Sequence, residues 1–292
     1  MLGHPSELLP APAPAALTDA VRLLRGRRVV ALTGAGVSTD SGIPDYRGPW
    51  SVPREPMTYQ EFVSGPAAQQ RYWARSHVGW SRMRQAEPND GHRALARLEA
   101  AGVLAALITQ NVDGLHQAAG SRRVTDLHGR IADVVCLRCG EVTDRAALHD
   151  RLTELNPGFA VPQPAVRTAP DGDAEVSDVT GFRLAGCLVC RGPLKPDVVF
   201  FGENVPKDRV ASCYQLVEEA EALLVAGSSL TVQSGLRFVR RAHRDGVPVV
   251  LVNHGPTRGD PLVTVRVDGG CSPALTALAS ALTDAAELTS GR

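Results

Sequence analysis

Short apolar runs alternate along this sequence with longer segments in which apolar residues recur at helical spacing. The runs have the length and composition of buried strands and occupy residues 29–33, 105–109, 198–201, 223–226, 247–253 and 263–267. Helix-like segments lie at 18–25, 92–101, 208–220 and 234–244. This alternation predicts an α/β fold with an open parallel sheet covered on both faces, in which ligands bind at the carboxyl ends of the strands.

Two stretches interrupt the alternation. Residues 48–90 predict a helical insertion with a small core of its own, because they hold all three tryptophans and two of the four tyrosines: Trp50, Tyr59, Tyr72, Trp73 and Trp80. Residues 131–195 hold two cysteine pairs and a stretch rich in Pro, Gly and Asp, which predicts a second small module with a long loop. The sheet domain is then left with residues 27–47, 91–130 and 196–285, after an N-terminal extension and first helix at 1–26.

The composition excludes several classes of protein. The chain has 292 residues, 43% of them hydrophobic, which is enough for a sizeable core and excludes a mostly disordered chain. Its 31 basic and 31 acidic residues cancel, which argues against bulk electrostatic binding to nucleic acid or to an anionic membrane. No apolar run reaches the ~20 residues of a membrane span. The N-terminal segment lacks the pattern of a targeting signal, so we expect a cytoplasmic protein. The oligomeric state stays open, with a monomer as the expectation.

The two cysteine pairs are the strongest local signal. A reducing compartment makes metal ligation a better explanation of these residues than disulfide bonds. Four thiolates suit one tetrahedral zinc ion, and because they leave no open position, the metal would be structural. The segment between the pairs, 140–186, is longer than usual for such sites and must loop out. The predicted zinc ligands are Cys136, Cys139, Cys187 and Cys190, with Cys213 and Cys271 left as free thiols.

Small and polar residues follow several of the predicted strands. Gly34-Ala35-Gly36 follows the first strand, where a glycine turn lets backbone approach a phosphate closely. On this segment alone, a tight turn for packing is an equally good explanation, since Thr39 stands where a dinucleotide fingerprint has its third glycine. Gly227-Ser228-Ser229 and Asn253 follow later strands in the same way and suit phosphate or ribose contact.

Three further segments carry groups that could do chemistry. Asp45-Tyr46-Arg47 places a carboxylate, a ring and a guanidinium on one loop stiffened by Pro44, although a surface salt bridge would explain it too. Polar side chains between Gln110 and Asp113 follow the second strand, where a ligand would satisfy them; helix capping is the alternative. His128 lies between Leu127 and Gly129 at the end of a short apolar stretch. A lone histidine is more often structural, but here its neighbours make a general base near neutral pH the better interpretation.

Together these segments resemble one family, the sirtuins, which are NAD-dependent protein lysine deacylases. The blocks at 34–47, 109–116, 127–129, 198–203 and 227–229 and the paired cysteines occur in the family's order, and the resemblance spans about residues 27–275. It implies a Rossmann-like NAD-binding domain and a smaller domain made of the helical insertion and the zinc-ribbon module. NAD and an acyl-lysine protein or peptide would meet in the cleft between them.

The resemblance also assigns roles to residues. Catalytic roles fall to His128, Asn111 and Asp113. Val199, Phe200, Phe201, Gly202 and Glu203 would pair with the substrate peptide as an added strand. The residues that would contact NAD are Gly34, Ala35, Gly36, Asp45, Tyr46, Arg47, Gln110, Asn111, Val112, Asp113, Gly227, Ser228, Ser229, Asn253, His254, Gly255 and Cys271.

The chemistry that the resemblance implies consumes NAD as a co-substrate. The acyl oxygen attacks C1′ of the nicotinamide ribose, nicotinamide leaves, and His128 acts as the general base on a ribose hydroxyl. Lysine and O-acyl-ADP-ribose are the products. A mono-ADP-ribosyltransferase using the same site and a non-catalytic NAD-sensing module are the alternatives.

Details of the sequence are similar to one branch of the family. The segments at 71–75, 120–123 and 255–258 look like class II, the branch of mitochondrial sirtuin four and its bacterial relatives. Desuccinylating relatives carry Tyr-x-x-Arg shortly before Glu-Pro-Asn. Here Tyr72-x-x-Arg75 lies further upstream of Glu87-Pro88-Asn89, so desuccinylation is not expected and the preferred acyl group stays open.

Overall fold

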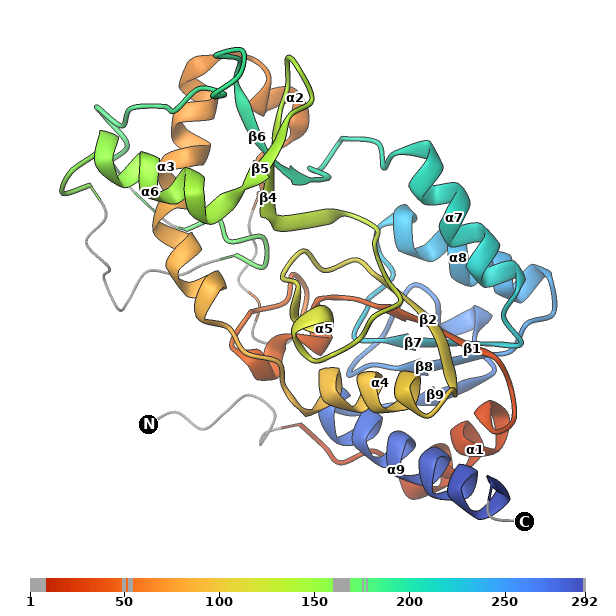
Figure 1. The fold of residues 1–292 in the computed structure, drawn as a ribbon. Helices are drawn as coiled ribbons and strands as arrows, with labels where there is room; N and C mark the ends of the chain where they lie inside the picture. The colour runs from red at the N-terminus through yellow and green to blue at the C-terminus, as the bar shows by residue number, and fades with distance from the viewer. Residues whose placement is uncertain are drawn as a thin grey trace.

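A six-stranded parallel sheet lies at the centre of the larger part of the molecule, with the strand order β3-β2-β1-β7-β8-β9 (Figure 1). The structure is a computed structural model that describes residues 9–48, 51, 55–159, 169–174, 176 and 178–290. The strands are β1 Val29–Thr33, β2 Leu104–Thr109, β3 Val124–Asp126, β7 Ala222–Ala226, β8 Val249–Val252 and β9 Val265–Val267. Because the chain runs outward from β1 on one side and from β7 on the other, the two form a topological switch point, where such sheets bind ligands.

Helices cover both faces of this sheet, and alternate residues of each strand face opposite layers. In β1, Val29 and Ala31 pack into the cluster formed with α1 Pro14–Leu24, α4 Asp90–Ala100 and α9 Cys271–Ser290. Val30 and Leu32 pack into the opposite cluster, with α7 Lys207–Glu218 and α8 Gln233–Arg244. The strands are therefore buried on both sides, which explains why they appear in the sequence as continuous apolar runs.

The smaller part of the molecule is built on an antiparallel sheet in the order β5-β4-β6. Its strands are β4 Gly129–Cys136, β5 Val142–Asp144 and β6 Leu194–Val198, and its helices are α2 Tyr59–Phe62, α3 Pro66–Gln85 and α6 Arg145–Leu155. Residues from the helical insertion and from the cysteine-bearing segment share one core, in which Phe62, Tyr72 and Trp73 pack with Leu148 and Leu194. Figure 1 shows this group of elements on one side of the main sheet.

The hydrophobic pattern located five of the six main-sheet strands within two residues of their ends; it did not include β3, and one prediction is wrong. The run at 198–201 is not a strand of the parallel sheet, because β6 ends at Val198 and pairs antiparallel with β4. Pairing direction depends on contacts that a single apolar run does not encode. Trp50, which we expected in the core of the insertion, lies outside the described residues. The domain boundaries proposed from the sequence stay a prediction.

Candidate active site

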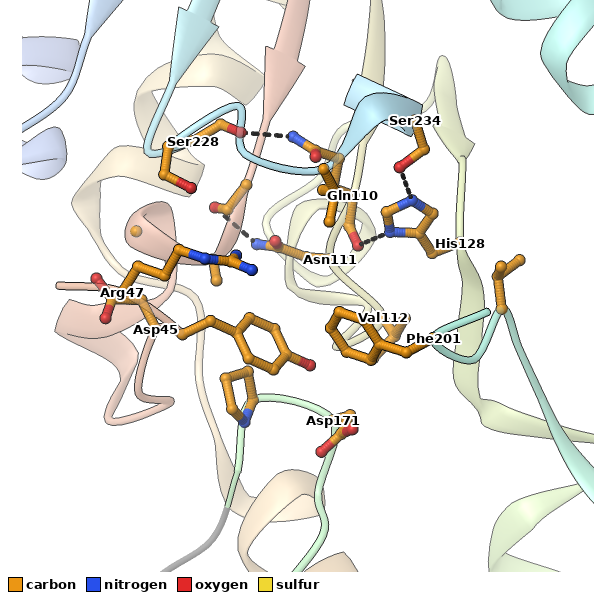
Figure 2. Close-up of a pocket in the computed structure, with 18 of the residues that line it drawn as sticks. Asp45, Arg47, Gln110, Asn111, Val112, His128, Asp171, Phe201, Ser228 and Ser234 are labelled. Atoms are coloured by element: carbon orange, nitrogen blue, oxygen red, sulfur yellow. Dashed lines mark hydrogen bonds between the residues drawn. The ribbon is translucent and has the colours of Figure 1, made fainter. Parts of the chain in front are cut away.

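A cavity of about 570 Å³ opens at the switch point between the two parts of the molecule. It is lined by the turns that follow β1, β2, β7 and β8, by the loop at 43–48 and by the segment that follows β6. Figure 2 shows side chains from these segments facing the same space. The geometry therefore brings together strand ends that are far apart in the sequence.

The glycine turns after β1 and β7 touch one another. A Cβ on Gly34 would lie 2.8 Å from the Gly227 carbonyl oxygen, and one on Gly36 would lie 2.9 Å from the Gly227 Cα. Gly227 has a φ of 61° and accepts a hydrogen bond from the Gly36 N–H over 2.9 Å. Glycine at these positions is thus required for close approach as well as for leaving backbone open to a phosphate.

His128 is held by two hydrogen bonds at the cavity wall (Figure 2). Its Nδ1 lies 2.9 Å from the Gln110 carbonyl, which only accepts, so Nδ1 carries the ring proton and Nε2 carries the lone pair. Burial lowers the pKa of His128 to about 4; the Gln110 hydrogen bond opposes this shift, and Arg209 and Arg237 add to it. At neutral pH the ring is an uncharged proton acceptor, as a general base must be.

Asn111 and Asp113 are tied to a residue that the sequence analysis did not assign, Ser38. The Ser38 hydroxyl donates to Oδ2 of Asp113 over 2.7 Å and accepts from Nδ2 of Asn111 over 3.0 Å. Burial raises the pKa of Asp113, opposed by hydrogen bonds from Leu115 and Ser38. Ser38 lies in the segment flagged for its glycines, but its burial in a polar cluster depends on distant partners, so no local sequence signal marked it.

The segment after β6 forms the opposite wall. A buried ammonium, that of Lys195, lies 3.2 Å from the Glu203 carboxylate, and the same carboxylate accepts the Phe200 N–H over 2.8 Å. Lys195 also donates to the carbonyls of Pro196 and Val198. These contacts fix the shape of a segment that continues the edge strand β6, so an extended peptide could be added beside it.

Nearly all the sequence-predicted site residues line this one cavity. His128, the residues at 34–36, 45–47, 110–113, 199–203, 227–229 and 253–255 all do so. Among the residues predicted to bind NAD or the substrate, Cys271 is the exception: it is buried at the start of α9 and does not line the cavity, so its contact with NAD stays a prediction. The sequence analysis missed several lining residues: Ser38, Ile43, Met57, Tyr72, Pro170, Asp171, Asp173, Val232, Gln233, Ser234 and Arg237.

Part of the segment that we expected to loop out returns to the cavity instead. Pro170, Asp171 and Asp173 line it, and Figure 2 shows Asp171 on the side opposite Ser228. Asp173 pairs with Arg75 of α3 over 2.7 Å. Composition marked this segment as a loop but could not tell that an ion pair to another element holds it against the site.

The four paired cysteines converge at one point of the smaller part. Their Sγ atoms all lie within 4.8 Å of one another, with 3.4 Å between Cys136 and Cys190 and 3.8 Å between Cys139 and Cys187. Tetrahedral zinc with Zn–S bonds of about 2.3 Å places sulfurs roughly 3.8 Å apart, so the cluster fits a zinc ion. It does not line the cavity, which agrees with a structural role.

Comparison with known proteins decides the family. Residues 34–234 match the profile of the Sir2 family. The chain belongs to the Sir2 family. The resemblance to sirtuins that the motifs carried is thereby confirmed, while the class II branch stays a prediction.

Bacterial relatives cover almost the whole of this Sir2 chain. It is 58% identical to NAD-dependent protein deacetylase 1 of Mycobacterium avium, over 90% of this chain and 95% of the relative. It is 55% identical to NAD-dependent protein deacetylase 1 of Streptomyces coelicolor, over 89% of this chain and 87% of the relative.

Solved Sir2 structures share the fold. One described as a complex of Sir2 with a p53 peptide and NAD⁺ is 32% identical, with a TM-score of 0.72, and the match covers 93% of this chain and 99% of that one. Another, bound to a myristoylated histone peptide, is 27% identical with a TM-score of 0.68, over 96% of this chain and 100% of that one. The Rossmann-like parallel sheet with a smaller cysteine-bearing part is thus the Sir2 architecture.

Proposed function

We propose that this chain is an NAD-dependent protein lysine deacylase that transfers the acyl group of a lysine to ADP-ribose and releases nicotinamide. One observation carries the proposal. His128, with its lone pair on Nε2, lines the same cavity as the touching glycine turns of β1 and β7 and the peptide-like edge at 199–203. A base, a phosphate cradle and a strand edge in one site are what acyl transfer from a peptide to a ribose requires.

The residues present fit NAD. The glycine turns leave backbone free of Cβ atoms where the pyrophosphate would lie, and Ser228 and Asn253 suit hydroxyl and phosphate contact. Asn111 and Asp113, held by Ser38, would orient the nicotinamide ribose and carboxamide. Tyr46 packs edge-on against Phe201, with 5.8 Å between ring centroids, and would exclude water from the reacting sugar face. Bound NAD supplies the sugar carbon that accepts the acyl oxygen.

The acyl-lysine would enter from the edge of β6. Relatives described as deacetylases, and Sir2 structures holding p53 and myristoylated histone peptides, support protein or peptide substrates. Ile43, Met57 and Tyr72 line the cavity near Phe200 and offer an apolar surface to the acyl chain. Burial raises the pKa of Tyr72, with Asp171 adding to the shift, so its phenol stays neutral.

Arg75 does not serve as an anchor for a dicarboxylic acyl group. Its guanidinium pairs with Asp173 over 2.7 Å and donates to the Ala174 carbonyl over 3.0 Å, and it does not line the cavity. We therefore expect acetyl-lysine and other neutral acyl groups to be preferred over succinyl-lysine by at least tenfold in kcat/KM. Asp173→Asn removes the charge that pairs with Arg75, so it should reduce the preference for neutral acyl groups over succinyl-lysine. Glu99→Gln, outside the cavity, should leave that preference unchanged.

Mass spectrometry of the products tests the proposed function. Purified protein is incubated with NAD and peptides that carry acetyl, longer fatty, lipoyl or dicarboxylic acyl-lysine. Nicotinamide and O-acyl-ADP-ribose should form in equal amounts, and His128→Ala should lower the rate ~10²-fold or more. A protein that gains ADP-ribose would instead show a mono-ADP-ribosyltransferase. NAD binding with no turnover would leave an NAD-sensing module.

The described part of the chain has no helix that is both long and apolar enough to cross a bilayer. The cytoplasmic compartment and the monomeric state stay predictions.

A further inference from the structure

The hydroxyl of Ser234 forms a hydrogen bond with Nε2 of His128, the nitrogen whose lone pair must accept the proton if His128 is the general base. Its Oγ lies 2.9 Å from Nε2 of His128, and Figure 2 shows the imidazole between Ser234 on one side and Gln110 on the other. Because the Gln110 carbonyl fixes the proton on Nδ1, the bond at Nε2 runs from the Ser234 O–H to the ring nitrogen. A ribose hydroxyl approaching His128 therefore meets an acceptor that is already in use.

The position of Ser234 is fixed by packing. It is the second residue of α8, and its neighbour Gly235 has no room for a side chain, since a Cβ there would lie 2.5 Å from Oε1 of Gln110. The Gln110 amide also donates to the Ser228 hydroxyl over 2.8 Å and to the Thr33 carbonyl. The start of α8 therefore packs against Gln110, whose carbonyl also orients His128. One residue thus helps to fix the positions of both the serine and the imidazole.

Ser234 and His128 both line the cavity in which the co-substrate is expected. A serine hydroxyl that donates to one partner keeps lone pairs to accept from another. Burial, Arg209 and Arg237 hold the His128 ring neutral, so it can take a proton through such a chain. The arrangement is that of a two-step proton path from a hydroxyl in the cavity, through Ser234, to Nε2 of His128.

We propose that Ser234 is a further catalytic residue of the deacylation, which passes the proton of a ribose hydroxyl to His128. In this step, which rests on the proposed function, the ribose O–H bond breaks as a new O–H bond forms on Oγ. The original Oγ–H bond breaks as the proton bonds to Nε2. The ribose oxygen keeps its electron pair and bonds to the acyl carbon. Serine ends the step as it began, the ring becomes imidazolium, and two protons move.

A solvent isotope experiment separates a relay from direct proton transfer. Deacylation rates are measured in mixtures of H₂O and D₂O for the wild type, Ser234→Ala and Ser234→Thr. A relay predicts a curved dependence on deuterium fraction in the wild type and in Ser234→Thr, which keeps the hydroxyl. Ser234→Ala should lose about 10–100-fold in kcat and show a linear dependence, while Ser212→Ala on the outer surface of α7 should match the wild type.

Further readouts separate the proton transfer from binding and from the first chemical step. In the ligand-free protein, ¹⁵N NMR of the His128 ring should show an Nε2 that accepts a hydrogen bond, lost in Ser234→Ala. Because that bond favours the neutral ring, its loss should raise the pKa of His128. NAD affinity and the acyl-peptide-dependent exchange of nicotinamide, which precedes the proton transfer, should stay within about threefold of the wild type.

Several outcomes would overturn the relay. A Ser234→Ala variant that turns over as fast as the wild type, or faster, means that Ser234 does not pass the proton. A linear isotope dependence in the wild type means that a single proton moves. Slow turnover with loss of nicotinamide exchange means that Ser234 shapes the binding site instead. Failure of the wild type to deacylate any peptide would refute the proposed function itself, which is a separate result.

Discussion

The Ser38 hydroxyl donates to the Asp113 carboxylate over 2.7 Å and, through the same oxygen, accepts from the Asn111 amide over 3.0 Å. One side chain from the turn after β1 thereby sets the orientation of two polar groups from the turn after β2. His92 of α4 stands behind it, with Nε2 3.4 Å from the Ser38 oxygen. A buried polar cluster therefore orients Asn111 and Asp113, the two residues proposed to hold the nicotinamide ribose.

Ser38→Ala should impair NAD use without unfolding the protein. The change removes a hydrogen bond to a buried carboxylate and leaves the Asn111 amide one acceptor short, which is worth about 1.5–3 kcal/mol. We expect kcat/KM for NAD to fall roughly 10–100-fold. The measurement is steady-state deacylation at varied NAD, with far-UV circular dichroism as a check of folding.

Ser64→Ala is the matched control for that variant, because this exposed hydroxyl donates to the Glu61 carbonyl beside it. It should leave kcat/KM unchanged. Equal NAD dependence in Ser38→Ala and in the wild type would show that Asn111 and Asp113 need no support from Ser38.

Arg209→Gln should move the acid limb of the pH–rate profile to higher pH. Burial lowers the pKa of His128 to about 4, and the positive charge of Arg209 is one of the groups that adds to this shift. The ring accepts a proton only when neutral, so activity is present above its pKa and lost below it. Removing the charge raises the pKa of His128, and the loss of activity on acidification begins at a higher pH. The profile of kcat/KM from about pH 4 to 8 checks this.

Arg244 lies on the last turn of α8 and pairs with Asp245. Arg244→Gln tests whether the loss of an arginine elsewhere also moves the acid limb. It should leave the acid limb in place. An acid limb that moves to lower pH in Arg209→Gln would contradict the assignment of that limb to His128.

The sequence predicted those parts of the site that depend on local pattern. The β1 turn was found because Gly34 and Gly36 follow an apolar run, and the zinc ligands were found because Cys-x-x-Cys is a local spacing. Ser38 and Ser234 were missed because a serine becomes functional only through its distant partners. Ser234 lies 106 residues from His128 in the chain, and Ser38 lies 75 from Asp113. No periodicity encodes such pairs.

One error about a larger element has the same origin. The segment at 198–201 was assigned to the parallel sheet because its residues are apolar, but Phe200 is buried against Phe62 and Tyr72 of the helical insertion. Cys271 was assigned to NAD through the resemblance alone; it is buried at the start of α9, and its contact with NAD stays a prediction. The apolar pattern of the segment at 198–201 indicated that Phe200 is buried but not which residues surround it.

Cys187→Ser should remove the zinc and destabilise the smaller part of the molecule first. Cys187 belongs to both the sulfur cluster and the core that contains Phe182 and Leu194. Zinc content by mass spectrometry should fall from one per chain to near zero, with a lower unfolding temperature and lost deacylation. Cys213→Ala, which alters a buried thiol of the main-sheet core, should keep the zinc. Full zinc content in Cys187→Ser would contradict the four-cysteine site.

Lys195→Met should weaken peptide use far more than NAD binding. The Lys195 side chain is 4% exposed, and its ammonium contacts Glu203, the carbonyls at 196 and 198, and the Phe200 ring, whose centroid is 4.8 Å away. Without it, the Glu203 carboxylate is left largely buried with only the Phe200 N–H as a partner in the described contacts, at a cost of about 3 kcal/mol in the free energy of unfolding. KM for the acyl-peptide should rise roughly tenfold.

The double variant Lys195→Met/Glu203→Gln separates the effect of the unpaired Glu203 charge from the effect of a change in the shape of the segment at 199–203. Gln keeps an acceptor for the Phe200 N–H but carries no charge, so the double variant should recover a large part of the stability lost in Lys195→Met. Urea unfolding gives the coupling free energy, and calorimetry with NAD and with the peptide gives the two affinities. If NAD affinity falls as much as peptide affinity, the ion pair supports the whole cavity. The expected result is a loss confined to the peptide, because Lys195 lies in β6 and Glu203 ends the segment that continues it.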